Sequence, residues 1–149
     1  MDTSTLVQIL QATLATDTAT RRAAESTFLS TWVPQPNHLF PALLSIMSNG
    51  SLPEELQCAA AVFFRRWIAR PVNENGKEDG DEDSSSAFFH LSDAKALQSG
   101  LLAAFTAARS KTVRNRIADA VGQVATIVAP YEEWRELVNL IVSSLQGGK

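Results

Sequence analysis

The sequence predicts an all-α fold in which about three and a half antiparallel helical hairpins stack into an open α-α superhelix. Three observations support this prediction. Apolar residues recur at helical spacing along the chain, and no segment alternates with a period of two. The helical stretches are separated by short breakers such as Pro34, Pro36 and Asn49-Gly50. One helical pattern also recurs three times in the same order.

Four helices are expected before residue 72. The first covers about 4–15, and the second follows Asp17, a plausible N-cap, and stops at Pro34. The third begins near Asn37, and the fourth begins at Pro53-Glu54 and ends at Arg70. Their inward-facing residues are expected to be Leu6, Ile9, Leu10 and Leu14; Ala24, Phe28 and Trp32; Phe40, Leu43, Leu44 and Met47; and Leu56, Ala60 and Trp67, with Phe63 and Phe64 on either side.

Residues 72–90 differ in character, because VNENGKEDGDEDSSSAFFH is rich in Gly, Ser and acids and has few apolar residues before Phe88. This composition predicts an acidic, flexible insert. The insert is interpreted most simply as a solvated linker. A functional interpretation is a tether for basic proteins.

Three further helices are expected after the insert. The fifth follows Ser92-Asp93, the sixth covers about 111–129, and the seventh begins at Pro130-Tyr131. Their core faces are expected to hold Leu97, Leu101, Leu102 and Phe105; Val113, Ile117, Ala120, Val121, Val124 and Val128; and Trp134, Leu137, Val138, Ile141 and Leu145.

Superposing the second, fourth and sixth helices indicates a repeat rather than a bundle. Arg21, Gln57 and Arg114 fall at the same position. The matched residues three and seven positions later are all apolar. Gln57 follows Arg21 by 36 residues and precedes Arg114 by 57. Removing the insert of roughly 20 residues brings the second spacing close to the first, in the range of tandem helical hairpins. We expect the stems of Arg21 and Arg114 to pack over the neighbouring repeat.

These segments resemble the HEAT repeats at the N-terminus of importin-beta nuclear transport receptors, most closely the importin beta-3 class. The matches are TRRAAESTF (20–28), AAAVFFRRW (59–67) and VRNRIADAVGQVA (113–125), and the Trp of YEEW (131–134) opens the next repeat. The resemblance implies one HEAT/armadillo-like domain over 1–149, with repeats at about 4–33, 37–70 and 92–129 and a partial repeat at 131–146. Gln57, where the pattern usually has a basic residue, and the long insert depart from the family.

The resemblance implies a role in protein transport between cytoplasm and nucleus, with the protein shuttling through the nuclear pore. Importin-beta receptors bind the small GTPase Ran in its GTP form on the inner helices of their N-terminal repeats, which releases import cargo. A helical wheel places a set of polar residues opposite the core, where they face the inner surface. The Ran contacts implied at these positions are Arg22, Ser26, Arg65, Asn115 and Asp119.

The composition of the chain limits which classes of partner and which compartment are expected. With 149 residues, 45% of them hydrophobic, the chain can bury a core, and its single cysteine, Cys58, suits a reducing compartment. A net charge of −3 favours basic cargo and argues against direct binding to nucleic acid. The acidic start of the chain and the absence of a long apolar run predict no secretory signal and no membrane insertion. Contacts to nucleoporins are expected only through the full-length receptor.

Two other functions stay open. One is a helical-repeat adaptor that binds a peptide or a basic protein, such as a histone or ribosomal protein, without Ran dependence. The other is a helical enzyme, although we expect no enzymatic activity, cofactor or metal, because His38, His90 and Cys58 have no partners at catalytic or metal-ligand spacing. The chain ends where the family pattern turns into another helix, so we expect a fragment. Because Leu137, Leu140, Ile141 and Leu145 cannot all pack on one preceding repeat, an apolar edge should be exposed or covered by another copy or a partner.

Overall fold

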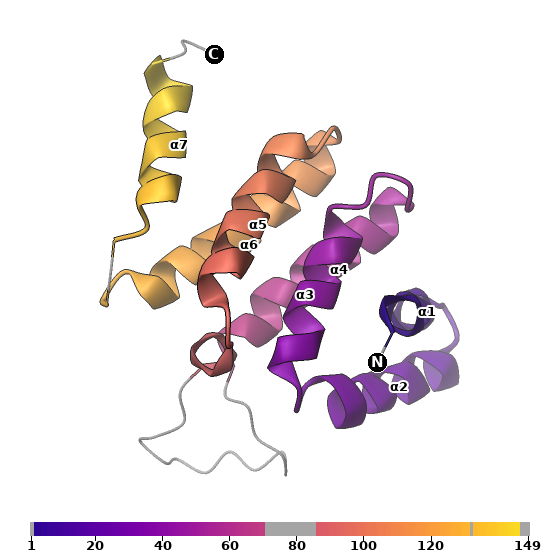
Figure 1. The fold of residues 1–149 in the computed structure, drawn as a ribbon. Helices are drawn as coiled ribbons and strands as arrows, with labels where there is room; N and C mark the ends of the chain where they lie inside the picture. Colours follow the sequence, from indigo (N-terminus) through magenta and orange to yellow (C-terminus); the bar gives the residue numbers. More distant parts are fainter. Residues whose placement is uncertain (1, 71–85, 132, 147–149) are drawn as a thin grey trace.

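A computed structural model of the chain describes residues 2–70, 86–131 and 133–146. The regular elements in this part are all helical (Figure 1). They are α1 (Thr3–Thr13), α2 (Thr18–Thr27), the π-helical turn η1 (Phe28–Trp32), α3 (Pro36–Met47), α4 (Glu54–Ile68), the 3-10 turn η2 (Ala87–His90), α5 (Ala94–Ala107), α6 (Lys111–Val128) and α7 (Arg135–Gln146). The all-α prediction is confirmed.

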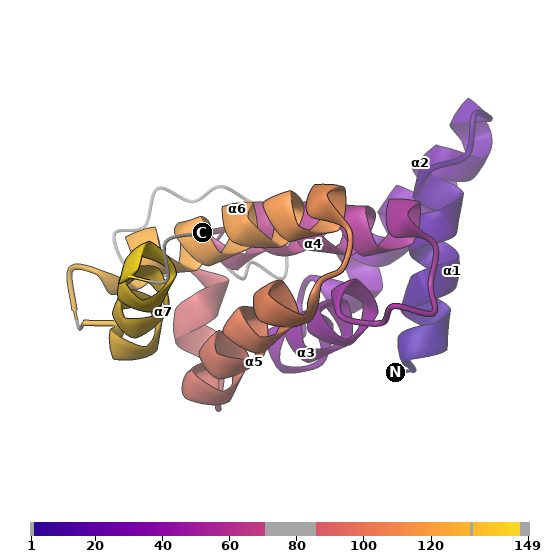
Figure 2. The same cartoon turned by 90° about the horizontal axis from the view of Figure 1, so that it is seen from above.

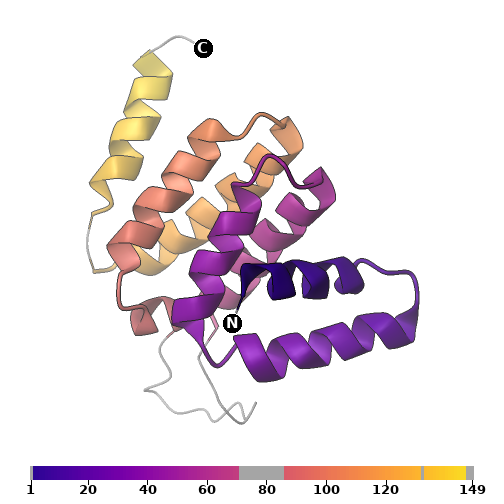
Figure 3. The same ribbon diagram turned by 45° about the vertical axis from the view of Figure 1, so that its right-hand side comes forward.

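The helices pair into three antiparallel hairpins, α1–α2, α3–α4 and α5–α6, followed by α7 alone (Figures 1 and 3). Helix α4 packs on α3 in its own hairpin and on α6 in the next, and α3 also packs on α5. Seen from above, α4 and α6 form one layer and α3 and α5 form the other, while the first hairpin crosses both at a steep angle (Figure 2). The stack is therefore open at its two ends, as in a solenoid.

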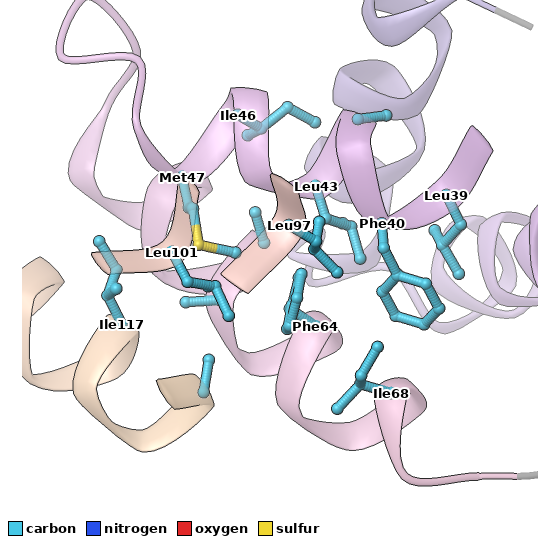
Figure 4. Packing of buried hydrophobic residues seen from close by; sticks show 14 of the residues in the cluster. Leu39, Phe40, Leu43, Ile46, Met47, Phe64, Ile68, Leu97, Leu101 and Ile117 are labelled. Carbon is cyan, nitrogen blue, oxygen red and sulfur yellow. The ribbon is translucent and has the colours of Figure 1, made fainter. Parts of the chain in front are cut away.

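The core is a continuous row of apolar side chains between the two layers. Phe64 of α4 is fully buried, and its ring meets that of Phe40 of α3 edge to face, with centroids 5.3 Å apart (Figure 4). Leu101 of α5 and Ile117 of α6 carry the same row into the third hairpin. All six apolar residues expected on the inner face of the sixth helix are buried. Helical period alone was enough to identify that face.

Caps fix where several helices begin. The carboxylate of Asp17 accepts from the backbone N–H of Thr20, and that of Asp93 accepts from Ala96. The N-cap at Asp17 was expected from the sequence, and the fifth helix was expected to follow Ser92-Asp93. Helix α4 differs, because its N-cap is Pro53 and no side chain caps its first N–H groups.

Repeat-equivalent residues close the second and third hairpins. The buried Gln57 side chain donates from Nε2 to the carbonyl oxygen of Met47, at the end of α3, over 3.1 Å. Arg114 donates from its guanidinium to the carbonyl oxygen of Ala108, just past α5, over 2.8 Å. Gln57 and Arg114 thus each link the start of the second helix of a hairpin to a backbone carbonyl at the end of its first helix. Arg21 and Arg114 are exposed as whole residues, and packing of their stems over the neighbouring repeat stays a prediction.

Four local expectations differ from the structure. Leu14 follows the last turn of α1 and is 49% exposed rather than inward. Trp67 is half-buried, and the fully buried position next to it is Ile68. Helix α7 begins at Arg135 rather than at Pro130. Residues 86–90, expected to belong to the insert, include the turn η2, which packs on α3 and α4 and buries Phe88.

Both sides of the insert are fixed to the stack. The backbone N–H of Ala87 donates to the carbonyl oxygen of Arg70 over 2.8 Å. Asn37, at the start of α3, accepts from the N–H of Ser92 over 2.8 Å. Residues 72–85 of the predicted acidic insert (72–90) lie outside the described residues. No helix in the described ranges is long and apolar enough to cross a membrane.

Candidate partner-binding surface

Helices α4 and α6 lie side by side (Figure 2), and a groove of about 410 Å³ is lined by residues of both. Small apolar residues, including Ala61 of α4 and Ala69 just after it, line the groove together with polar ones. Arg65 contributes from α4 and Asp119 from α6. The structure therefore brings together two of the predicted contact residues, which are 54 positions apart in the chain.

The α4–α6 groove is strongly cationic. Four arginines line it, namely Arg65, Arg66 and Arg70 at the end of α4 and Arg116 on α6. Its acidic lining residue, Asp119, forms an ion pair with Arg116 over 3.8 Å, with both side chains about half exposed. Such an exposed pair contributes only about 0–1 kcal/mol to stability.

The remaining arginines differ in their partners. The guanidinium of Arg70 lies 4.7 Å from the ring centre of Trp67, in a cation–π contact. Arg65 and Arg66 are exposed and form no ion pair with any residue that the structure describes. Both occupy the last turn of α4, where positive charge also interacts favourably with the helix dipole.

A second groove of about 550 Å³ adjoins the first, between the first hairpin and α4. Its apolar lining includes three large exposed residues, Leu14, Leu29 and Val62. Arg66 and Arg116 line this groove as well, together with the acids Glu25 and Glu55. The α1/α2–α4 groove thus offers apolar contacts beside charges of both signs.

Cys58 lies in the α1/α2–α4 groove and is half-buried. Burial raises the pKa of its thiol above the ordinary value, the nearby Arg116 opposes this increase, and Glu54 adds to it. A thiol with a raised pKa carries little thiolate near neutral pH and is a poor nucleophile.

The five predicted contact residues are all exposed, but they do not form one cluster. Arg65 and Asp119 line the α4–α6 groove, whereas Asn115 lies earlier on α6. Arg22 and Ser26 lie on α2, in the hairpin that crosses the others, and line neither groove.

The sequence interpretation missed Arg66 and Arg116, which line both grooves. One signal for Arg116 was available, because it precedes Asp119 by three residues on the same helix and such pairs are neighbours on the helix surface. Arg66 lies on the flank of α4, where a wheel does not distinguish a groove wall from open solvent.

A further groove of about 730 Å³ lies where the loops of the second and third hairpins meet, and it is lined by small residues such as Gly50 and Ser51, by apolar ones such as Leu52, and by Glu54 and Arg109. Within the described part of the chain, no three His, Cys, Asp or Glu side chains are placed to hold a metal ion. The charged and apolar grooves on α4 are therefore the clearest candidates for a binding function.

Comparison with known proteins supports the fold. No protein-family model matches the sequence, and no curated protein matches it. Among solved structures, the chain is similar to the crystal structure of Kap121p bound to RanGTP, with a TM-score of 0.72 and 22% sequence identity. The similarity covers 99% of this chain and 13% of the Kap121p chain. The chain therefore has a karyopherin-like solenoid of HEAT-type hairpins and spans a small part of that protein's length.

Proposed function

We propose that this chain is the N-terminal HEAT-repeat part of a nuclear transport receptor of the importin-beta family, most like the importin beta-3 class. The observation that carries the proposal is the shared fold over 99% of the chain with Kap121p, a protein whose structure was solved with RanGTP bound. The repeat motifs in the sequence support it independently, because they predicted the stacked hairpins without reference to coordinates.

In this proposal, the chain binds Ran in its GTP form on the layer formed by α4 and α6. Arg65 and Asp119 contribute from the α4–α6 groove, and Arg22, Ser26 and Asn115 contribute at the margin of the surface. A specific interface usually covers about 800 Å² on each partner, which is more than one groove of this size provides. Contacts from both grooves and from the first hairpin are therefore needed for firm binding.

The wider role follows from the same proposal. The full-length receptor shuttles between cytoplasm and nucleus, carries basic cargo, contacts nucleoporins and releases cargo when Ran binds. Those functions belong to the whole protein, because the matched region is only 13% of the Kap121p chain.

The test is a binding assay with purified Ran loaded with a non-hydrolysable GTP analogue or with GDP. The chain should bind the GTP-analogue form selectively. The charge reversals Arg65→Glu and Asp119→Lys should each weaken this binding by about tenfold or more, since like charges brought together at an interface are costly. Arg109→Glu, an exposed arginine that lines neither α4 groove, should bind as the wild type does.

Equal binding to both nucleotide forms, or to neither, would contradict the proposal. If a histone or ribosomal protein binds instead, regardless of nucleotide, the chain is an adaptor for basic proteins.

A further inference from the structure

We infer that the α4–α6 groove is a docking site for an acidic polypeptide segment, one in which Asp or Glu side chains recur along a short extended or helical stretch. The groove is lined by four arginines and one aspartate. Because Asp119 is already paired with Arg116, Arg65 and Arg66 are the guanidinium groups that a partner's carboxylates would meet first.

Guanidinium groups suit carboxylate partners for a geometric reason. Their planar fork presents parallel N–H donors that match the two oxygens of a carboxylate. Arg65 and Arg66 are adjacent on α4, and Arg116 faces them from α6, so charge lies on both walls of the groove. A segment lying along the groove would meet cations on both sides.

The net charge of the chain conceals this local field. The whole sequence has 13 basic and 16 acidic residues. Residues 72–85 alone hold one basic residue, Lys77, and six acids: Glu74, Glu78, Asp79, Asp81, Glu82 and Asp83. The rest of the chain therefore has 12 basic and 10 acidic residues, a net charge of +2. Basic partners, expected from the net charge, do not suit the α4–α6 groove.

Arginine clusters also bind nucleic acid, but the lining of this groove favours polypeptide. Sequence-tolerant binding of single strands relies on exposed aromatic rings on which bases stack. Trp67, which follows Arg66 in the chain, is half-buried and has the guanidinium of Arg70 over its ring. Alanines and Val62 supply the apolar lining instead, and these match aliphatic side chains.

The adjoining α1/α2–α4 groove offers apolar contacts to the same segment. Leu29 and Val62 are exposed there, while Glu25 and Glu55 offset the charge of the shared Arg66 and Arg116. The acids of the segment would therefore lie in the α4–α6 groove, and apolar residues beside them would reach the second groove. The inference does not depend on the proposed binding of Ran, because it rests only on the charge and the lining of the two grooves.

Fluorescence anisotropy with labelled peptides tests the inference on the full chain. The probe is a Glu-Ala-Leu repeat peptide, and its matched control is a Lys-Ala-Leu peptide of equal length. The acidic peptide should bind, its affinity should fall as salt is added, and the basic peptide should not bind. No detectable binding of the acidic peptide, or equal binding of both peptides, would overturn the inference.

Variants locate the site. The double substitution Arg65→Ala/Arg66→Ala should weaken binding of the acidic peptide about tenfold, with the loss of two exposed ion pairs. Arg65→Lys/Arg66→Lys should retain part of the affinity, because it keeps the charge but loses the fork. Arg109→Ala is the matched control and should bind normally. Circular dichroism should show all variants folded, since these side chains are exposed.

Three outcomes separate this inference from the alternatives and from the proposed function. If the double alanine variant binds the acidic peptide as well as the wild type does, the peptide binds elsewhere and the inference fails. If labelled single-stranded DNA binds at the same arginines more tightly than the acidic peptide, the occupant is nucleic acid and the inference also fails. A chain that binds the acidic peptide but not Ran would leave this inference standing and overturn the proposed function.

Discussion

Replacing Phe64 with alanine tests whether the middle hairpin is held by the row of side chains between the layers. Phe64 has no exposed surface and meets Phe40 edge to face (Figure 4). Its neighbour Phe63 is only half-buried, although it also makes an edge-to-face contact, with Phe28 at 5.0 Å. The two residues are chemically identical and adjacent, so they form a matched pair that differs in burial.

The expected costs differ severalfold. Phe64→Ala removes a whole buried ring and leaves a cavity, so the free energy of unfolding should fall by about 3–5 kcal/mol. Phe63→Ala loses the aromatic pair and part of its buried area, about 1–2 kcal/mol. A domain of ordinary stability has about 5–15 kcal/mol in all, so the Phe64→Ala variant should be close to marginal.

Urea unfolding followed by far-ultraviolet circular dichroism measures both variants. With a typical slope of about 2 kcal/mol per molar urea, Phe64→Ala should lower the midpoint by roughly 2 M and Phe63→Ala by roughly 0.5–1 M. Equal shifts for the two variants would refute the packing described here. They would instead favour the symmetric arrangement expected from the helical wheel, in which both rings flank the buried face.

The remaining predictions concern a glycine, a cap and the cysteine. Gly122→Ala should raise the free energy of unfolding by about 0.5–1 kcal/mol in thermal unfolding, because Gly122 lies inside α6 and no atom lies within 4 Å of an added Cβ. Gly100→Ala should give a smaller gain, because its added Cβ would lie 2.5 Å from a leucine methyl group, which would have to move. Hydrogen bonds from Thr20 and neighbouring N–H groups lower the pKa of Asp17. The ionised carboxylate therefore contributes its full stabilisation above the ordinary aspartate pKa, and this stabilisation is lost as the pH falls through the folded-state pKa. When the free energy of unfolding is measured as a function of acid pH, the Asp17→Asn variant should lack this loss. Cys58 should react with a disulfide reagent more slowly than free cysteine near neutral pH because burial raises the pKa of its thiol, and a rate equal to that of free cysteine would show that the thiol is not buried.

Local patterns predicted the helices and their buried faces well. The N-caps Asp17 and Asp93 and the six-residue apolar face of α6 depend on contacts within one helix, which sequence spacing shows directly. Predictions failed where an element ends or meets a distant one. Leu14 is exposed because α1 ends before it, and the segment at 86–90 packs because α3 and α4 cover it. Neither outcome is visible in local periodicity.

The exposed apolar edge at the end of the stack was also expected. Val138, Ile141 and Val142 of α7 are between 42% and 50% exposed, and α7 contacts little besides α5. Leu137 and Leu140 are half-buried and Ile141 is exposed, so these residues do not all pack on the preceding repeat, as expected. The placement of Val138 and Ile141 on the core face is wrong, because both are exposed. The side chain of Leu145 lies outside the described residues. The helix face was predicted, whereas its rotation against α5 depended on packing.

The sequence by itself determined that this chain is a row of amphipathic helices with a repeating register, because burial of an apolar stripe follows from 3.6-residue periodicity alone. Only the tertiary structure decided which polar residues share a surface. Arg65, Arg66, Arg116 and Asp119 meet because α4 packs beside α6, and the crossing of the first hairpin removes Arg22 and Ser26 from that groove. Helix crossing depends on how side chains of distant segments interlock. Local charge depends on that geometry too, which is why an acidic chain has a cationic groove.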